Sequence, residues 1–250
     1  MNGKVVLFVL GLLVISLACR TFSASSPTTS PAGISTISPT QARPAPTATP
    51  GTGMPSQGAI LFQDDFSSPD SGWITTDQDL IALDYFEGGY RATVKSSYVA
   101  SFSAFPKIQF TDASIEADAQ FLNGPDGSLF GLLCRATAAP DLQSGYEMNI
   151  SPGGAVGIVK VTGALAGQQT ALTSGKSPLI HTGTATNHLR MDCSGDHIAI
   201  YVNGRQLVEV QDSDYKQGRV GFVFGANSDP GFQVLFDNFT VRQIGAGTSF

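Results

Sequence analysis

The sequence predicts an all-β fold: a two-sheet antiparallel jelly-roll sandwich, preceded by a signal peptide and a disordered linker rich in Pro, Ser and Thr. Three observations predict it. The 250 residues are 42% hydrophobic but only 14% charged and include 28 Gly, a composition that favours short strands and turns. From Ala59 onward, short apolar and polar runs alternate between turn signals. No segment there shows the apolar periodicity of an amphipathic helix three turns long.

The chain begins with a segment typical of an exported protein. In residues 1–19, Lys4 precedes an apolar run, Val5–Leu17, which is shorter than the roughly 20 residues that span a bilayer. This order is typical of a secretory signal peptide. Because Cys19 directly follows Ala18, the segment resembles a bacterial lipoprotein signal. The resemblance implies a lipidated Cys19 and anchoring at the outer face of the cytoplasmic membrane or at the cell surface. An uncleaved anchor or an ordinary signal peptide is the alternative.

Residues 20–58 predict a disordered tether. From residue 21 onward this segment has seven prolines, many Ser and Thr, and a single charge, Arg43. Such a segment buries too little apolar surface to offset the entropy lost on ordering. We expect it to hold a folded domain, residues 59–243, away from the lipid surface, with a flexible tail at residues 244–250.

The predicted domain is acidic. All twenty Asp and Glu follow residue 58, together with eleven of the fourteen Lys and Arg, so this part carries a net charge of −9. Without a basic cluster the domain cannot neutralise a row of phosphates, and nucleic acid is not expected as a partner. For the same reason we expect contact with a lipid membrane only through the N-terminal anchor.

Ten runs suit β-strands because apolar and polar residues alternate in them or because β-branched and aromatic residues prevail. Asn203-Gly204, the favoured type I′ pair, stands where a hairpin turn belongs. Ten or more strands in one domain give a two-sheet sandwich or jelly roll. The runs are residues 89–95, 113–121, 128–135, 146–151, 155–161, 188–193, 197–204, 206–210, 219–224 and 232–241.

Alternation also assigns side chains to the two faces of a strand. In residues 113–121, Ile115 and Ala117 fall on the apolar face, and Glu116 and Asp118 fall on the polar one. The two cysteines that follow Cys19, Cys134 and Cys193, both fall on predicted core faces. In an exported protein a disulfide between them, joining neighbouring strands, is favoured, with two buried free thiols as the alternative.

Several motifs together carry a family resemblance. The series DDFSSPDSGW, GLLCR, GYEMNIS, NHLRMDCSGD, IYVNGRQL, GRVGFVF and FDNFTV resembles the concanavalin A-like lectin/glucanase superfamily, over about residues 60–242. Within it, the series is similar to the 3-keto-disaccharide hydrolase-like (DUF1080) and laminin G-like branches. The resemblance implies a curved jelly roll whose concave sheet often binds carbohydrate. Catalysis does not follow, because this fold carries many unrelated functions.

The segment from Glu116 to Gln120 resembles the E-x-D-x-E strand of laminarinase-type glycoside hydrolases. There the first Glu would be the nucleophile, the Asp its helper and the last Glu the acid/base. Position 120 is Gln, which cannot shuttle a proton, whereas retaining hydrolysis needs two carboxyl groups. We therefore expect Glu116 and Asp118 to lie on a solvated acidic face, and we assign no catalytic residue.

Planar polar and aromatic side chains nevertheless make carbohydrate binding the favoured function. Arg135 and Glu147 are expected to face one another across adjacent strands, as a sugar clamp or as a cross-strand salt bridge. The alternatives are a tethered structural, sensor or protein-interaction domain whose protein partner is unknown, and an enzyme that cleaves glycosides or 3-keto-glycosides. The candidate carbohydrate-binding residues are Arg135, Tyr146, Glu147, Arg190, Asp192, Tyr201, Glu116 and Asp118, with Tyr98 as a further aromatic.

The acids of the DDFSSPDSGW stretch predict one cofactor, a structural Ca²⁺. In a jelly roll the first strand usually lies beside the last, so Asp65 and Asp237 can approach each other. Two carboxylates with backbone carbonyls can supply the six to eight oxygens that Ca²⁺ takes. The alternative is that these acids shape turns. No other cofactor is expected.

Overall fold

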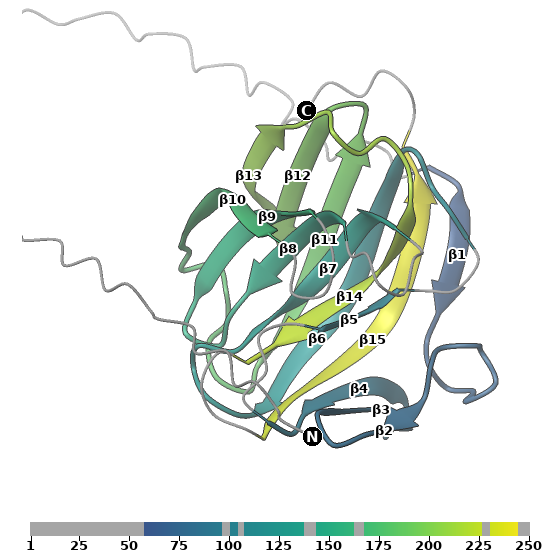
Figure 1. Ribbon diagram of the computed structural model, residues 1–250, viewed down its shortest axis with the longest axis vertical. Coiled ribbons are helices and arrows are strands. Elements are labelled where there is room, and N and C mark those ends of the chain that lie inside the picture. The colour runs from purple at the N-terminus through teal and green to yellow at the C-terminus, as the bar shows by residue number, and fades with distance from the viewer. Residues whose placement is uncertain are drawn as a thin grey trace, which may run out of the picture. The chain divides into compact units, whose positions relative to one another are not determined.

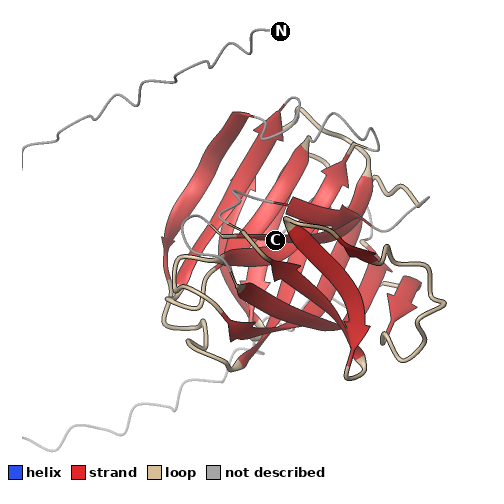
Figure 2. Cartoon of the chain, turned by 60° about the horizontal axis from the view of Figure 1, so that its bottom comes forward, coloured by secondary structure: helices blue, strands red, loops and turns tan. Residues whose placement is uncertain are grey.

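The computed structural model describes residues 58–96, 101–104 (backbone alone), 108–137, 144–162, 168–226 and 231–244. Cys19, Tyr98, the predicted signal peptide and nearly all of the predicted tether lie outside these residues. All regular structure in the described part is β (Figure 2). None of it forms a helix long and apolar enough to cross a membrane.

Fifteen strands form the described fold, which confirms the all-β prediction. They are β1 Ile60–Asp64, β2 Thr76–Asp77, β3 Ile81–Phe86, β4 Gly89–Val94, β5 Ser101–Ala104, β6 Ala113–Asn123, β7 Leu129–Ala136, β8 Gly145–Ile150, β9 Ala155–Thr162, β10 Gln168–Lys176, β11 Thr186–Ser194, β12 His197–Val202, β13 Arg205–Gln211, β14 Arg219–Gly225 and β15 Phe232–Gln243.

The strands form two antiparallel sheets that pack face to face (Figure 1). Sheet A has nine strands in the order β13-β12-β11-β6-β15-β4-β3-β2, and β1 pairs with the later part of β15. Sheet B has six strands in the order β10-β9-β8-β7-β14-β5. The predicted pairing of the first strand with the last is therefore confirmed.

The core lies between the sheets and follows the predicted alternation. On β6, Ile115 and Ala117 are fully buried against residues of sheet B. Trp73, the single tryptophan, packs on Phe222 and donates its indole N–H to the carboxylate of Asp64 at 2.9 Å. The DDFSSPDSGW stretch is thus mainly structural and forms the beginning of the folded domain. Its aromatic rings join the core, and Asp64 holds the indole of Trp73 in place.

A disulfide joins Cys134 of β7 to Cys193 of β11. Because β7 belongs to sheet B and β11 to sheet A, the bond links the two layers directly. Both cysteines are buried, at 1% exposure each. The predicted Cys134–Cys193 disulfide is confirmed, but its expected place between neighbouring strands is wrong, because the two strands belong to different sheets.

Candidate functional site

Two planar polar side chains stand on the outward face of sheet B. Tyr146, Met148 and Ile150 of β8 belong to the core cluster, so alternation turns Glu147 and Asn149 the other way. Both are nonetheless buried, at 1% and 6% exposure. The Asn149 side-chain N–H group donates to Glu147 Oε2 at 3.2 Å. We call these two residues the β8 pair.

The β8 pair leaves one acceptor unused. Within the described part of the chain, Asn149 Oδ1 is buried and accepts no hydrogen bond. A buried polar atom without a partner costs about 1–3 kcal/mol of stability. Such atoms are rare in folded proteins and call for an explanation, for example a bound group. A donor from a ligand, such as a hydroxyl, would satisfy this oxygen.

Glycines border Asn149 on both neighbouring strands. The register places Asn149 opposite Gly131 of β7 and opposite Gly157 of β9. A Cβ on Gly131 would lie 1.9 Å from the backbone oxygen of Met148, so close strand packing itself requires this glycine. The consequence for the site is that neither neighbouring strand supplies a side chain at these register positions that could donate to the Asn149 amide oxygen.

The chemistry available on this sheet is limited by its single acid. Glu147 is the only carboxylate in the six strands of sheet B. Glu147 and Asn149 follow the spacing of the first two acids in an E-x-D-x-E strand, but an amide takes the second position. A two-carboxylate hydrolysis therefore has only one of its groups on the strands of this sheet.

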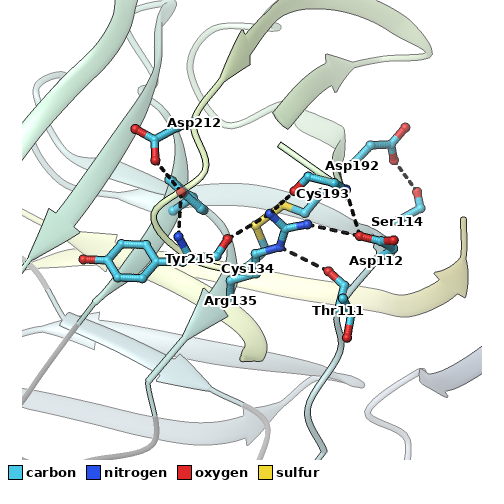
Figure 3. The surroundings of a disulfide bond; sticks show 11 residues. Thr111, Asp112, Ser114, Cys134, Arg135, Asp192, Cys193, Asp212 and Tyr215 are labelled. Atoms are coloured by element: carbon cyan, nitrogen blue, oxygen red, sulfur yellow. Dashed lines mark hydrogen bonds and ion pairs between the residues drawn. A yellow bond between two sulfur atoms is a disulfide. The ribbon is translucent and has the colours of Figure 1, made fainter. Parts of the chain in front are cut away.

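The expected Arg135–Glu147 pair is wrong. Leu133, not Arg135, is the register partner of Glu147. Arg135 has a left-handed backbone, with φ of 54°. Its guanidinium makes four contacts beside the disulfide (Figure 3): to the carbonyls of Thr111 (3.1 Å), Gly195 (2.8 Å) and Tyr215 (3.0 Å) and to Asp112 Oδ1 (3.2 Å). Arg135 is a structural clasp, not a sugar clamp.

Tyr146 is also structural. It points into the core and is fully buried. Its hydroxyl donates to Asp212 Oδ1 at 2.5 Å and accepts the backbone N–H of Tyr215 at 3.1 Å. Burial, together with the hydrogen bond to Asp212, raises the pKa of Tyr146 to about 12. A fully buried phenol offers no surface on which a sugar could stack, so the predicted carbohydrate-binding role of Tyr146 is wrong.

The other five candidates lie together on the outward face of sheet A. Arg190 forms a bidentate ion pair with Asp192, at 2.8 and 2.6 Å. Its guanidinium carbon lies 4.6 Å from the ring centroid of Tyr201, and its Nε lies 3.8 Å from Glu116 Oε1. Nearby, Asp118 accepts hydrogen bonds from Asn238 Nδ2 and, in one tautomer, from His188 Nδ1. These charges largely bind one another. The solvated acidic face expected for Glu116 and Asp118 is wrong for Glu116, which is 7% exposed and lies against Arg190.

Binding of a structural Ca²⁺ by Asp65 and Asp237 stays a prediction. Asp65 Oδ1 already accepts the backbone N–H and the hydroxyl of Ser67, which is turn-shaping work. Among the described residues, no group of three or more His, Cys, Asp and Glu is arranged to hold a metal ion. Burial, and after it the negative charges of Asp118 and Asp65, raise the pKa of Asp237 above its usual value.

Replacing Asp237 by asparagine tests the two alternatives. A carboxyl whose folded-state pKa is raised destabilises the folded state when ionised. The penalty is absent below the unfolded-state pKa, near 4, and is complete above the folded-state value. Asp237→Asn should therefore raise the melting temperature at pH 7 in EDTA, and this gain should vanish below about pH 4. Calcium binding predicts that added Ca²⁺ raises the melting temperature of the parent protein and that Asp237→Asn abolishes this rise.

The comparisons with known proteins agree with this architecture. The model of the 3-keto-alpha-glucoside-1,2-lyase-like domain matches residues 57–242, about three quarters of the chain. The chain belongs to this family. This confirms the predicted 3-keto-disaccharide hydrolase-like resemblance. In the comparison with curated proteins, nothing matches.

Solved structures share the fold of this lyase-like domain. Carbohydrate-binding module CBM66 from Bacillus subtilis is 20% identical, with a TM-score of 0.55 over 69% of this chain and 96% of that one. A B. subtilis protein with a galectin-like fold is 15% identical, with a TM-score of 0.57 over 76% and 98%. The GH16 endo-β-1,3(4)-glucanase SCLam is 12% identical, with a TM-score of 0.52 over 76% and 92%. At these identities the likeness establishes the jelly-roll sandwich.

Proposed function

We propose that the lyase-like domain is a non-catalytic carbohydrate-binding module and that its site is the β8 pair on sheet B. The observation that carries the proposal is the buried, unused acceptor Asn149 Oδ1, held beside Glu147 and bordered by glycines. A sugar offers what this site lacks, because one of its hydroxyls can donate a hydrogen bond to Asn149 Oδ1.

The single carboxylate favours binding over hydrolysis. Glycoside cleavage by the two-carboxylate route needs an acid and a base or nucleophile at a set separation. Glu147 has no second acid on the strands of its sheet. The structural neighbours, which include a carbohydrate-binding module and a glucanase, support a carbohydrate ligand for this chain.

The family description supports a second candidate, eliminative cleavage of a 3-keto-glucoside. Elimination needs one base to remove the C2 proton next to the keto group, and Glu147 would be that base. The C–H electrons then form a C1–C2 double bond while the C1–O bond breaks, and the aglycone leaves as an alcohol once it takes up a proton. This activity predicts formation of an unsaturated keto sugar from a 3-keto-glucoside. The product should be absent with Glu147→Gln. No product from the parent protein would remove this candidate and leave binding as the function.

The N-terminal segment supports export and anchoring as part of the same proposal. A lipidated Cys19 followed by a long polar tether would place the module outside the cell, where polysaccharide is the abundant ligand. Mass spectrometry of the mature N-terminus tests this point. An unlipidated start beyond Cys19 would refute anchoring without affecting the sugar site.

Two substitutions test the β8 pair. Glu147→Gln should weaken retention in polysaccharide-containing native gels by about tenfold to a hundredfold, since hydrogen bonds to charged groups contribute about 1.5–3 kcal/mol. Asn149→Ala should weaken it by about twofold to tenfold, since hydrogen bonds between neutral groups contribute about 0.5–1.5 kcal/mol. The matched control is Glu116→Gln, the same change at a buried glutamate on the outward face of the other sheet.

The control variant should be retained as strongly as the parent protein, and all variants should melt within a few degrees of it. If Glu116→Gln weakens retention and Glu147→Gln does not, the sugar site lies on sheet A and the assignment to the β8 pair is wrong. If no polysaccharide in a broad panel retains the parent protein, carbohydrate binding itself is refuted. A protein-interaction domain would then be the better account.

A further inference from the structure

Sheet A carries a groove at its β2 end, on the side of the sandwich opposite to the β8 pair. The groove has a volume of about 600 Å³, within the range of ligand pockets. One cross-strand row runs along it, in which Asp77 pairs with Ala82, Ala82 with Thr93, and Thr93 with Gln233. The small side chain of Ala82 deepens the middle of the row.

The charges that line the groove cancel in pairs. Arg91 forms a bidentate pair with Asp84, at 3.0 and 2.6 Å, and Lys95 pairs with Asp77. Two cations and two anions give no net charge, so the groove does not favour a phosphate, a carboxylate or a metal ion. A neutral ligand that both donates and accepts hydrogen bonds matches it better.

The groove also presents flat polar groups in fixed positions. The guanidinium carbon of Arg91 lies 3.7 Å from the ring centroid of Phe86, and Asp84 holds the same guanidinium from one edge. Gln233 Nε2 donates to Thr93 Oγ1 at a long 3.3 Å. Planar guanidinium, carboxylate and amide groups next to a hydroxyl suit the equatorial hydroxyls of a pyranose ring, as long as water can be displaced from them.

We propose that this groove is a second carbohydrate site, which makes the domain bivalent. The ligand class rests on the function proposed above, but the site is independent of it, since the groove and the β8 pair lie on different sheets. A module with two sites on opposite faces cross-links polysaccharide chains, because each face can hold a different chain. Cross-linking also gains avidity that neither site has alone.

Turbidity of a soluble polysaccharide that retains the parent protein in gels tests the proposal. The parent protein should make the solution turbid, and calorimetry should give two sites per chain. Arg91→Ala and Gln233→Ala should remove turbidity at equal protein concentration and leave one site. Arg205→Ala is the matched control, an exposed cation on β13 of the same sheet, and it should behave as the parent protein does.

Each result discriminates between the two proposals. If both groove variants keep full turbidity and two sites, the groove proposal is overturned, and cross-linking would then come from self-association. One site per chain in the parent protein overturns it as well. Loss of the remaining site in Arg91→Ala/Glu147→Gln supports both proposals. If no polysaccharide binds the parent protein, the proposed function fails and the groove proposal fails with it.

Discussion

Replacing Arg135 by alanine is expected to lower the free energy of unfolding by about 3–5 kcal/mol, since four hydrogen bonds of a buried guanidinium are lost and each hydrogen bond to a charged group contributes about 1.5–3 kcal/mol. The guanidinium side chain is 2% exposed, and it is the shared donor for three carbonyls and Asp112. In a domain of this size such a loss lowers the melting temperature by roughly 10 °C. Calorimetry or thermal circular dichroism measures it.

The matched control for Arg135→Ala is Arg91→Ala. Arg91 also makes a bidentate pair with an aspartate, but its side chain and that of Asp84 are 22% and 41% exposed. Exposed pairs contribute about 0–1 kcal/mol, so this variant should melt close to the parent protein. A change of less than about 2 °C in Arg135→Ala would contradict the clasp, and Arg135 would become available again as a ligand-binding residue.

Loss of the disulfide is expected to have an effect of similar size. The bond closes a loop with a sequence separation of 59 residues, which gives about 4 kcal/mol in the chain-entropy model. The double variant Cys134→Ala/Cys193→Ala should unfold at a clearly lower guanidinium concentration. The parent protein should behave in the same way once it is reduced in the unfolded state.

Burial of the disulfide supplies a control within the same protein. Because both cysteines are 1% exposed, a mild reductant should leave the folded parent protein unchanged over the time of a titration. Unfolding of the double variant at the concentration found for the parent protein would contradict the stabilising role. Cys134 adjoins Arg135 in the chain, so the triple variant should lose less than the sum of the two effects.

The sequence was informative where alternation was regular. It placed Ile115 and Ala117 inside and Glu116 and Asp118 on the opposite face. It also put Cys134 and Cys193 on core faces, which is why the disulfide could be predicted, although it did not show that the bond joins the two sheets. Tyr146 could have been assigned to the core in the same way, since it lies two and four residues before Met148 and Ile150 and so shares their face of β8. Its aromatic ring led us to predict that it binds sugar, and its full burial contradicts that prediction.

Register and backbone irregularity explain what the sequence did not reveal. Arg135 leaves the alternation of β7 because its backbone is left-handed, and no pattern in GLLCR signals that conformation. Asn149 gains its significance from Gly131 and Gly157, which are neighbours only through strand pairing. The edge strand β10 was missed because its polar run QQTALTSGK does not alternate.

An NMR titration of the parent protein with an oligosaccharide fragment of the retained polysaccharide is the sharpest test of whether the sugar binds at the β8 pair. The side-chain amide signals of Asn149 report on the site itself, because ligand binding would give Asn149 Oδ1 its missing donor. If the sugar binds at the β8 pair, these signals and the backbone amides of β7, β8 and β9 should shift together and saturate with the ligand. Shifts confined to β6, β11 and β12, with the Asn149 amide unchanged, would contradict it.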